Sequence, residues 1–314
     1  MRKSSPSTSG NSSETMEKFC HPKRCGAYFE GWYFKLQTRG GDALALIPAL
    51  HQDAAHRRSA SLQVISREGS WWLEYPAAEF GACEERLRIR AGENVFTEKG
   101  LRVNIDADGL RLRGAVGFGA FSRLCSDIMG PFSYVPCMEC SHGVISMSHS
   151  LEGALSINGR TLDFTGGTGY IETDRGRSFP SSYLWAQCSW GGPERGGFML
   201  SVATIPTLLG SFTGCICALV HEGHEYRLAT YRGARVEHWS CGGAVIRQGR
   251  WLLKVGLLDS GAKPLRAPVR GSMGRTVHES LSSGLRFCLT RDGETILERT
   301  DNCAGFEYAE KSGA

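Results

Sequence analysis

The chain has 314 residues, of which 36 are basic and 32 acidic, giving a net charge of +4. This length allows one large domain or two of roughly 150 residues, and the small charge excess argues against nucleic acid or an anionic membrane surface as a partner. The 12 cysteines are irregularly spaced and follow no apolar signal segment, which indicates free thiols and a cytoplasmic location.

Residues 1–18 are rich in serine and poor in large apolar side chains, so we expect a disordered tail. From residue 19 onward, short apolar runs alternate with glycine, asparagine and charged clusters at intervals of roughly ten residues, which is typical of β-strands. Asn158-Gly159 between two such runs is a hairpin signal. Only a few windows, such as 77–87, would tolerate a helix. Together with the 40 glycines, this pattern predicts an all-β barrel or sandwich.

Residues 28–35 form an aromatic stretch around a single carboxylate, Glu30. In a strand, Tyr28, Glu30 and Trp32 point to one face and the alternate residues point to the other. A carboxylate among aromatic rings is costly to leave ionised and unpaired, so Glu30 either pairs with an arginine or has a raised pKa. A buried ion pair that closes a barrel and an acid that faces a substrate both fit this pattern.

Residues 130–149 contain two prolines and several possible ligands or acid/base groups, among them His142 and His149. The spacing of Cys137, Cys140 and His142 suggests zinc, but a structural site needs a fourth ligand and none is adjacent, so we expect no metal. His142 fits either a core histidine or an acid/base group that faces a cavity.

The central segment of the chain, residues 166–190, carries two neighbouring acids. Tyr170, Glu172 and Asp174 are spaced by two, so in a strand they share one face. Close like charges and an apolar lining raise a carboxyl pKa, which produces a general acid near neutral pH. Arg175 and Arg177 favour the opposite interpretation, an ionised and structural carboxylate held by a guanidinium. Both interpretations remain open from the residues alone.

The segments that follow indicate buried strands. Tyr183, Trp185 and Gln187 alternate with smaller residues, as in a strand that lines a cavity. Residues 196–220 are uncharged and long enough to span a membrane. Polar residues, a proline and glycines interrupt this run, so we expect two strands, 198–205 and 215–220, and no stable membrane insertion. The chain contains no phosphate-binding loop, no nucleophile elbow and no His-Glu-x-x-His motif.

Three stretches together, residues 28–35, 140–147 and 169–180, resemble the tocopherol cyclase family, and residues 304–307 are similar to its C-terminus. The resemblance runs in matching order from about residue 19 to residue 308. The family pattern usually has Lys and Trp where this chain has Thr173 and Arg175. The missing Trp would remove an aromatic wall, and the added arginine could pair with Asp174.

The resemblance implies two lipocalin-like antiparallel β-barrels packed together, formed by residues 19–165 and 166–314. It also implies closure of a chromanol ring on a prenylated hydroquinone, with no redox change and no cofactor. This chemistry needs a Brønsted acid, a dry pocket and aromatic faces that stabilise a carbocation. The catalytic residues would be Asp174 as the proton donor, Glu172 as the second candidate donor, and His142. The substrate-binding residues would be Tyr28, Glu30, Trp32, Tyr170, Arg177, Tyr183, Trp185 and Gln187.

A carrier that binds a hydrophobic metabolite without turnover would have the same apolar cavity, whereas an interaction protein would have no deep cavity. The partner we expect is therefore a small apolar or prenylated molecule and not nucleic acid. Access to a lipid substrate is compatible with a cytoplasmic protein that works at a membrane surface. The sequence does not indicate the oligomeric state.

Overall fold

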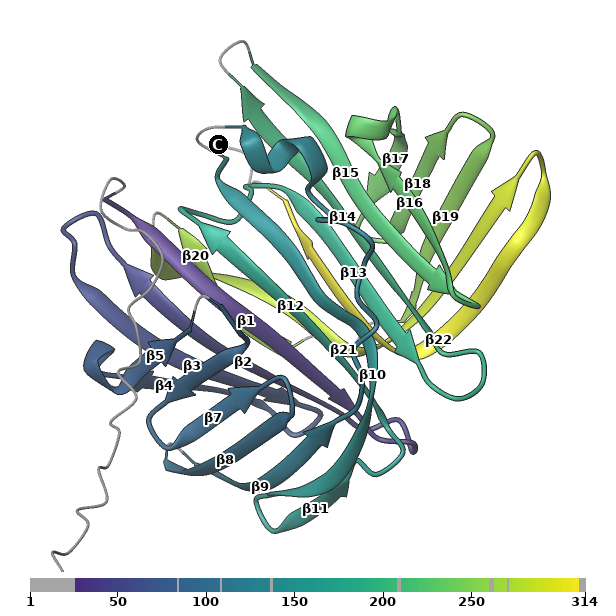
Figure 1. Ribbon diagram of the computed structural model, residues 1–314. Helices are drawn as coiled ribbons and strands as arrows, with labels where there is room; N and C mark the ends of the chain where they lie inside the picture. The colour runs from purple at the N-terminus through teal and green to yellow at the C-terminus, as the bar shows by residue number, and fades with distance from the viewer. Residues whose placement is uncertain are drawn as a thin grey trace, which may run out of the picture.

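The structure is a computed structural model that describes residues 26–310, apart from 84, 108, 136–137, 208–209, 260–262 and 270. Two antiparallel sheets make up this part of the chain and lie beside each other (Figure 1). The expected disordered tail, residues 1–18, and Cys137 of the zinc-like motif lie outside the described residues.

The first sheet has 12 strands, in the order β4-β3-β2-β1-β12-β10-β9-β8-β7-β6-β5, with β11 paired to β10. Its strands are β1 (Tyr28–Gln37), β2 (Ala43–Gln52), β3 (Arg58–Ser66), β4 (Ser70–Tyr75), β5 (Phe80–Ala82), β6 (Arg88–Ala91), β7 (Asn94–Thr97), β8 (Gly100–Ala107), β9 (Leu110–Phe118), β10 (Cys140–Ile157), β11 (Arg160–Asp163) and β12 (Thr168–Gly176). The hairpin expected at Asn158-Gly159 joins β10 to β11, and both residues have the positive φ that a two-residue turn of this kind needs.

The second sheet has 10 strands, in the order β16-β15-β14-β13-β22-β21-β19-β18-β17, with β20 paired to β21. Its strands are β13 (Tyr183–Trp190), β14 (Gly196–Thr207), β15 (Gly210–His221), β16 (His224–Ala229), β17 (Arg235–Ser240), β18 (Gly243–Gln248), β19 (Trp251–Asp259), β20 (Lys263–Val269), β21 (Ser272–Arg291) and β22 (Glu294–Ala309). The described residues of the uncharged run form the paired strands β14 and β15, which are longer than the expected strands 198–205 and 215–220.

In the part of the chain that the structure describes, the helical elements are three short 3-10 helices, η1 (Ala77–Glu79), η2 (Gly130–Tyr134) and η3 (Thr230–Arg232). The window 77–87 therefore contains a single helical turn, and within the described ranges there is no α-helix. Accordingly, no helix in this part of the chain has the length and apolar character needed to cross a membrane.

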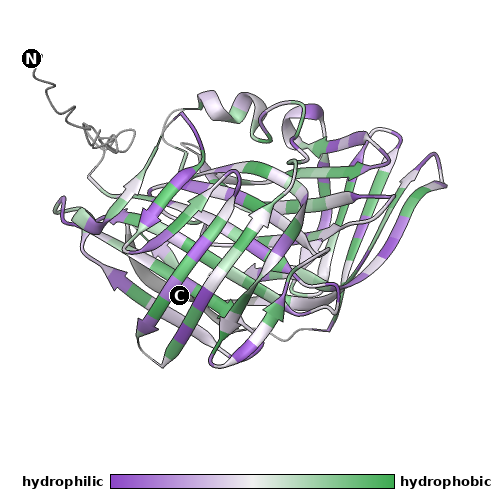
Figure 2. Cartoon of the chain, turned by 60° about the horizontal axis from the view of Figure 1, so that its bottom comes forward, coloured by the Kyte–Doolittle hydropathy of each residue, from purple (hydrophilic) through white to green (hydrophobic). Residues whose placement is uncertain are grey.

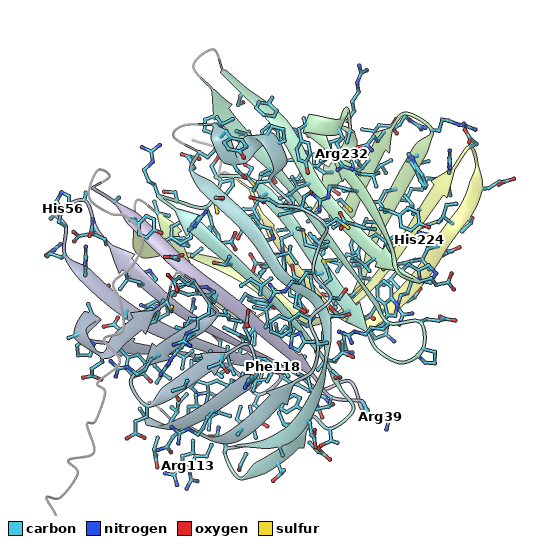
Figure 3. The ribbon with its side chains drawn as sticks, in the orientation of Figure 1. Arg39, His56, Arg113, Phe118, His224 and Arg232 are labelled. Carbon is cyan, nitrogen blue, oxygen red and sulfur yellow. The ribbon has the colours of Figure 1, made fainter. Side chains whose placement is uncertain are left out.

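The predicted all-β fold of two lipocalin-like barrels is confirmed, because each sheet curls around an apolar core of its own. Phe34 and Phe96 belong to the first core, and Phe198 and Phe287 to the second. Burying each such side chain contributes roughly 1.5 to 3 kcal/mol. Strands show alternating apolar and polar residues in Figure 2. In Figure 3, charged side chains such as Arg113 point outward to solvent.

A third apolar layer fills the space between the two sheets. It contains Tyr33, Met147 and Tyr170 from the first sheet, and Trp185 and Met199 from the second. Strand β1 is therefore buried on both of its faces, since its alternate residues pack into the first core. The layer between the sheets therefore offers an apolar setting for a cavity.

Strand β12 lies in the middle of the first sheet, between β1 and β10. In the register of these strands, Asp174 is opposite His142 of β10 and Gly31 of β1. Opposed residues share a face, and glycine adds no side chain that would cover the acid. Because β12 belongs to the first sheet, the chain changes sheet after Gly176, later than the expected boundary between residues 165 and 166.

The close approach of β12 to β10 depends on Gly169. A Cβ atom there would lie 2.3 Å from Nε2 of His149, a fully buried histidine whose pKa burial lowers to about 3. We expect Gly169→Ala to reduce the free energy of unfolding by about 1 to 3 kcal/mol, because the core must shift to admit the methyl group. Chemical denaturation measures this change. Gly256→Ala is the control, since no atom lies within 4 Å of its added Cβ, and equal stability of both variants would contradict the prediction.

Candidate functional site

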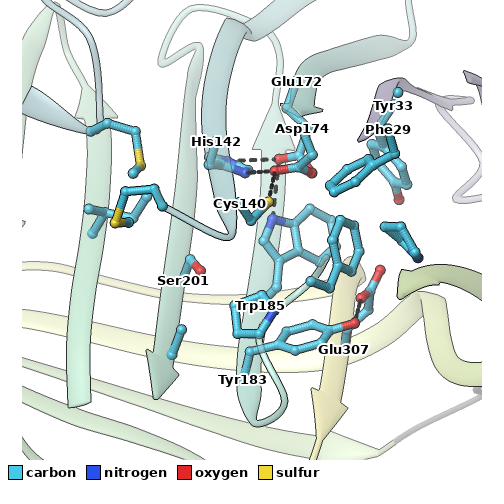
Figure 4. A pocket seen from close by; sticks show the side chains of 18 of the residues that line it. Phe29, Tyr33, Cys140, His142, Glu172, Asp174, Tyr183, Trp185, Ser201 and Glu307 are labelled. Atoms are coloured by element: carbon cyan, nitrogen blue, oxygen red, sulfur yellow. Dashed lines mark hydrogen bonds and ion pairs between the residues drawn. The ribbon is translucent and has the colours of Figure 1, made fainter. Parts of the chain in front are cut away.

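A cavity lies in the apolar layer between the two sheets (Figure 4). Residues of β1, β2, β10 and β12 line it on one side, and residues of β13, β14, β15 and β22 on the other. It encloses about 160 Å³. Cavities of roughly this size hold benzene, so a single ring-sized group can be enclosed without movement of the walls.

Three titratable side chains meet at one wall of this cavity, and they are the three predicted catalytic residues. His142 Nδ1 lies 2.9 Å from Asp174 Oδ1, and His142 Nε2 lies 3.3 Å from Glu172 Oε2. The first contact is a hydrogen bond, whereas the second has an ion-pair distance without hydrogen-bond geometry. We refer to Glu172, Asp174 and His142 as the acid cluster.

Glu172 is the most buried member of the acid cluster, with 4% of its surface exposed. Its Oε2 accepts hydrogen bonds from the Tyr170 hydroxyl at 2.5 Å and from the Trp185 indole N–H at 3.2 Å. Burial raises the pKa of Glu172 to about 7; the charge of His142 opposes this rise and that of Asp174 adds to it. A carboxyl group with this pKa is still partly protonated near neutral pH, so it can donate a proton.

His142 is held as a cation by the two acids. Burial alone would lower the pKa of His142, but the charges of Glu172 and Asp174 and the hydrogen bond to Asp174 raise this pKa to about 9. A buried imidazolium between two carboxyl groups has its charge compensated locally. Because the two acids share one histidine, the protonation of each member depends on the other two.

The arginines considered as partners of the acids do not pair with them. The other hydrogen-bond donor to Asp174 is the thiol of Cys140, whose Sγ is 3.6 Å from Oδ1 and whose pKa is raised by burial. Arg175 is exposed, and the alternation of β12 places it and Thr173 on the face opposite the acids. Thr173 donates a hydrogen bond to the Gly31 carbonyl at 3.0 Å. The two departures from the family pattern therefore remove no wall of this cavity.

Aromatic rings form much of the remaining wall. Tyr33 meets Trp185 edge to face with ring centroids 5.4 Å apart. Phe179 makes similar contacts with Phe29 at 5.4 Å and with Tyr183 at 5.8 Å. Tyr183 and Trp185 line the cavity, the position that the sequence pattern predicts for them. Such rings exclude water, and their faces can stabilise a cation.

The residues expected from β1 lie on the wrong face of that strand to reach the cavity. Trp32 packs into the first core, and Glu30 accepts a hydrogen bond from Tyr28 at 3.2 Å and is opposite Arg175 in the strand register. None of Tyr28, Glu30 and Trp32 lines the cavity. The alternate residues of β1, such as Tyr33, face the cavity instead.

Three further predicted residues lie around the cavity without lining it. Tyr170 is behind Glu172 and holds that carboxyl group. Gln187 is buried between the sheets, where its Oε1 accepts a hydrogen bond from Lys35 Nζ at 3.3 Å. Arg177 is exposed, and its backbone N–H donates a hydrogen bond to the Glu139 carbonyl at 2.8 Å.

Sequence reasoning missed five polar residues of the cavity wall, which are His51, Gln63, Ser201, Arg266 and Glu307. Glu307 of β22 accepts a hydrogen bond from the Tyr183 hydroxyl at 2.7 Å. The resemblance of residues 304–307 to the family was a signal for it. His51 of β2 also lines the cavity, and nothing in its surroundings in the sequence distinguished it from the adjoining apolar run.

The acid cluster is also the group of side chains that could hold a metal ion. One nitrogen of His142 and one oxygen each of Glu172 and Asp174 lie within 4.8 Å of one another. A divalent cation would have to displace the proton that keeps His142 charged, because only neutral imidazole binds metal. Cys140 of the zinc-like motif hydrogen-bonds Asp174 instead of adding to a thiolate site.

The comparisons with known proteins identify a family and a fold. A sequence profile described as tocopherol cyclase-like matches residues 109–309, more than half of the chain. No curated protein sequence matches the chain.

Among solved structures, CghA is similar with a TM-score of 0.56 and 11% identity, over 92% of this chain and 90% of that one. CghA with Sch210972 gives a TM-score of 0.54 and 13% identity, with the same coverage. Kievitone hydratase from Nectria haematococca gives 0.50 and 11% identity, over 91% of this chain and 90% of that one. At these identities the similarity establishes the fold and not the reaction.

The raised pKa of His142 predicts how stability depends on pH. In the unfolded chain the imidazole loses its proton near pH 6.5, whereas in the folded protein it keeps the proton until about pH 9. The stabilisation is therefore complete below pH 6.5 and is lost as the pH rises to 9. We expect this loss to be on the order of 1 to 3 kcal/mol, measured by denaturant unfolding at several pH values.

His142→Gln should reduce the loss in the free energy of unfolding between pH 6.5 and 9. His238→Gln, a substitution of an exposed histidine, should leave that loss unchanged. Parallel curves for His142→Gln and the unsubstituted protein would show that His142 is not held as a cation.

Proposed function

Because the chain belongs to the tocopherol cyclase-like family, we propose that it is an enzyme that protonates an alkene of an apolar, prenylated substrate and closes a ring on it. The observation that carries this proposal is the acid cluster at the wall of a mostly apolar cavity. A cavity that only stored a hydrophobic molecule would need no such buried group, since buried charges reduce the affinity for an apolar ligand.

The geometry favours Glu172 as the proton donor over Asp174, which the family resemblance put first. Glu172 is the more buried of the two acids, with 5% of its side chain exposed against 20% for Asp174, and burial raises the pKa of Glu172 to about 7. Glu172 directs its Oε2 to Tyr170 and Trp185, and its Oε1 accepts no hydrogen bond from the described residues. Oε1 is thus the oxygen that can carry and deliver the proton. Asp174 and His142 act through Glu172, because their charges affect the pKa of its carboxyl group.

Transfer of the proton to the less substituted alkene carbon would leave a positive charge on the tertiary carbon. The ring faces of Trp185 and Tyr33 stabilise that charge, and the apolar walls keep water from capturing it. Attack by a phenol oxygen closes the ring and releases the phenolic proton, which restores the protonated Glu172. No atom or electron is gained or lost, so the product is an isomer of the substrate.

The reaction is tested with a geranylated methylhydroquinone as substrate and mass spectrometry of the products. We expect a ring-closed product of unchanged mass, and a decrease of kcat by roughly 10² to 10⁴-fold in Glu172→Gln, which cannot deliver the proton. Glu298→Gln is the control, because Glu298 is a surface carboxylate paired with Arg286.

Full turnover by Glu172→Gln would exclude Glu172 as the donor. Tight binding of the substrate without any product would favour the carrier function, and a product heavier by one water would identify a hydratase.

A further inference from the structure

Five large apolar side chains are exposed among the described residues: Tyr134, Val135, Phe212, Leu258 and Val269. Strand β19, which carries Leu258, contributes no residue to the cavity lining. The other four adjoin that lining, and we refer to Tyr134, Val135, Phe212 and Val269 as the apolar rim. Single exposed apolar side chains are ordinary, whereas a group of them around a cavity indicates a contact surface.

Three members of the apolar rim come from two segments that also supply cavity residues. Tyr134, 88% exposed, and Val135 follow Phe132, which lines the cavity, at the end of η2. Phe212 of β15 is opposite Ile205 of β14 in the strand register, and Ile205 also lines the cavity. The rim therefore continues the cavity wall outward to the surface.

Val269 borders the same end of the cavity from β20. It follows Pro268, whose carbonyl accepts a hydrogen bond from the Phe179 backbone N–H at 3.1 Å, and both of these residues line the cavity. Phe179 is half-buried, whereas Glu172 and Trp185 at the inner wall are buried. Exposure thus increases from the acid cluster toward the rim, which lies at the open end of the cavity.

The short helix η3 connects the two main parts of the rim. A Cβ atom on Gly214 would lie 3.2 Å from the Phe212 ring and 3.7 Å from Thr230 Oγ1. Tyr231 of η3 meets Phe132 of η2 edge to face, with ring centroids 5.6 Å apart. In Figure 1, η2 and the paired ends of β14 and β15 accordingly lie at the same end of the molecule. The rim is therefore one contiguous surface.

The two segments that carry most of the rim, residues 128–138 and 196–220, contain no charged residue. Other exposed strands carry ion pairs, such as Arg286 with Glu298. A surface without charges can leave water without the cost of dehydrating ions. Tyr134 adds an apolar ring with a polar tip, the type of side chain that suits a boundary between lipid and water. This chemistry matches a neutral lipid surface.

The rim is small for a stable interface with another protein. Such interfaces bury roughly 800 Å² on each partner and need matched shapes. The rim offers four side chains, of which Phe212 and Val269 are only 38% and 42% exposed. A lipid layer needs no matched shape, because its molecules rearrange around the inserted side chains.

We propose that the apolar rim docks on a neutral lipid surface, so that an apolar substrate passes from the lipid into the cavity without crossing water. The inference rests on the proposed function for the substrate, since a prenylated molecule prefers lipid to water. Docking of this kind is reversible, because a few inserted side chains bind far more weakly than a membrane-spanning segment.

The test is co-sedimentation of the full chain with phosphatidylcholine vesicles, which carry no net charge. We expect the double variant Tyr134→Ser/Phe212→Ser to lower the partition constant roughly tenfold, because two apolar rings no longer leave water. Leu258→Ser removes an exposed apolar side chain outside the rim and should leave the constant unchanged. Binding should persist in high salt, since no ion pair contributes to it. Equal melting temperatures show that both variants are folded.

The proposal is overturned if the unsubstituted protein does not bind the vesicles, or if the folded double variant binds them equally well. Binding that requires phosphatidylglycerol and is lost in high salt would assign the contact to charged groups instead. A dimer in analytical ultracentrifugation that the double variant converts to a monomer would assign the rim to a second copy of the chain. Because vesicle binding needs no turnover, a failure to detect ring closure leaves this result unaffected.

Discussion

The site depends on the mutual compensation of one buried and two partly buried polar groups in an apolar layer. Glu172, Asp174 and His142 would each be costly to bury alone, and together they form a cluster whose charges nearly cancel. The cluster exists only in the observed register of β12 with β10. A slip of one residue would turn all the side chains of β12 to the opposite face and leave the charges unpaired. Strand pairing and site chemistry therefore stabilise each other.

The sequence predicted the fold and the two acids for a local reason. Alternation along a strand is a short-range property, so the spacing of Glu172 and Asp174 was enough to place them on one face. His142 could be recognised as a candidate, but its contact with Asp174 depends on the pairing of β10 with β12, which no local pattern encodes. The position of Glu307 likewise depends on long-range strand pairing, because this residue lines the cavity from β22, the last strand of the chain.

Two alternatives considered from the sequence differ from the structure, one in β1 and one in β12. Strand β1 is apolar on both faces because it separates the first core from the layer between the sheets. Hydrophobic pattern cannot identify the cavity face of such a strand, and the face carrying Trp32 was chosen in place of the face carrying Tyr33. From the sequence, Arg175 could have paired with Asp174, whereas it is exposed and lies on the opposite face of β12, the face on which Ile171 packs into the first core.

The position of β12 also determines how the two halves of the molecule can be separated. A fragment that ended at residue 166 would lack the strand that pairs with both β1 and β10. Two unsatisfied strand edges, rich in apolar residues, would then be open to other chains, and such edges promote aggregation. A division of this protein into two separately expressed halves should therefore be made between Gly176 and Tyr183. Even that division would expose to water the apolar layer between the two sheets.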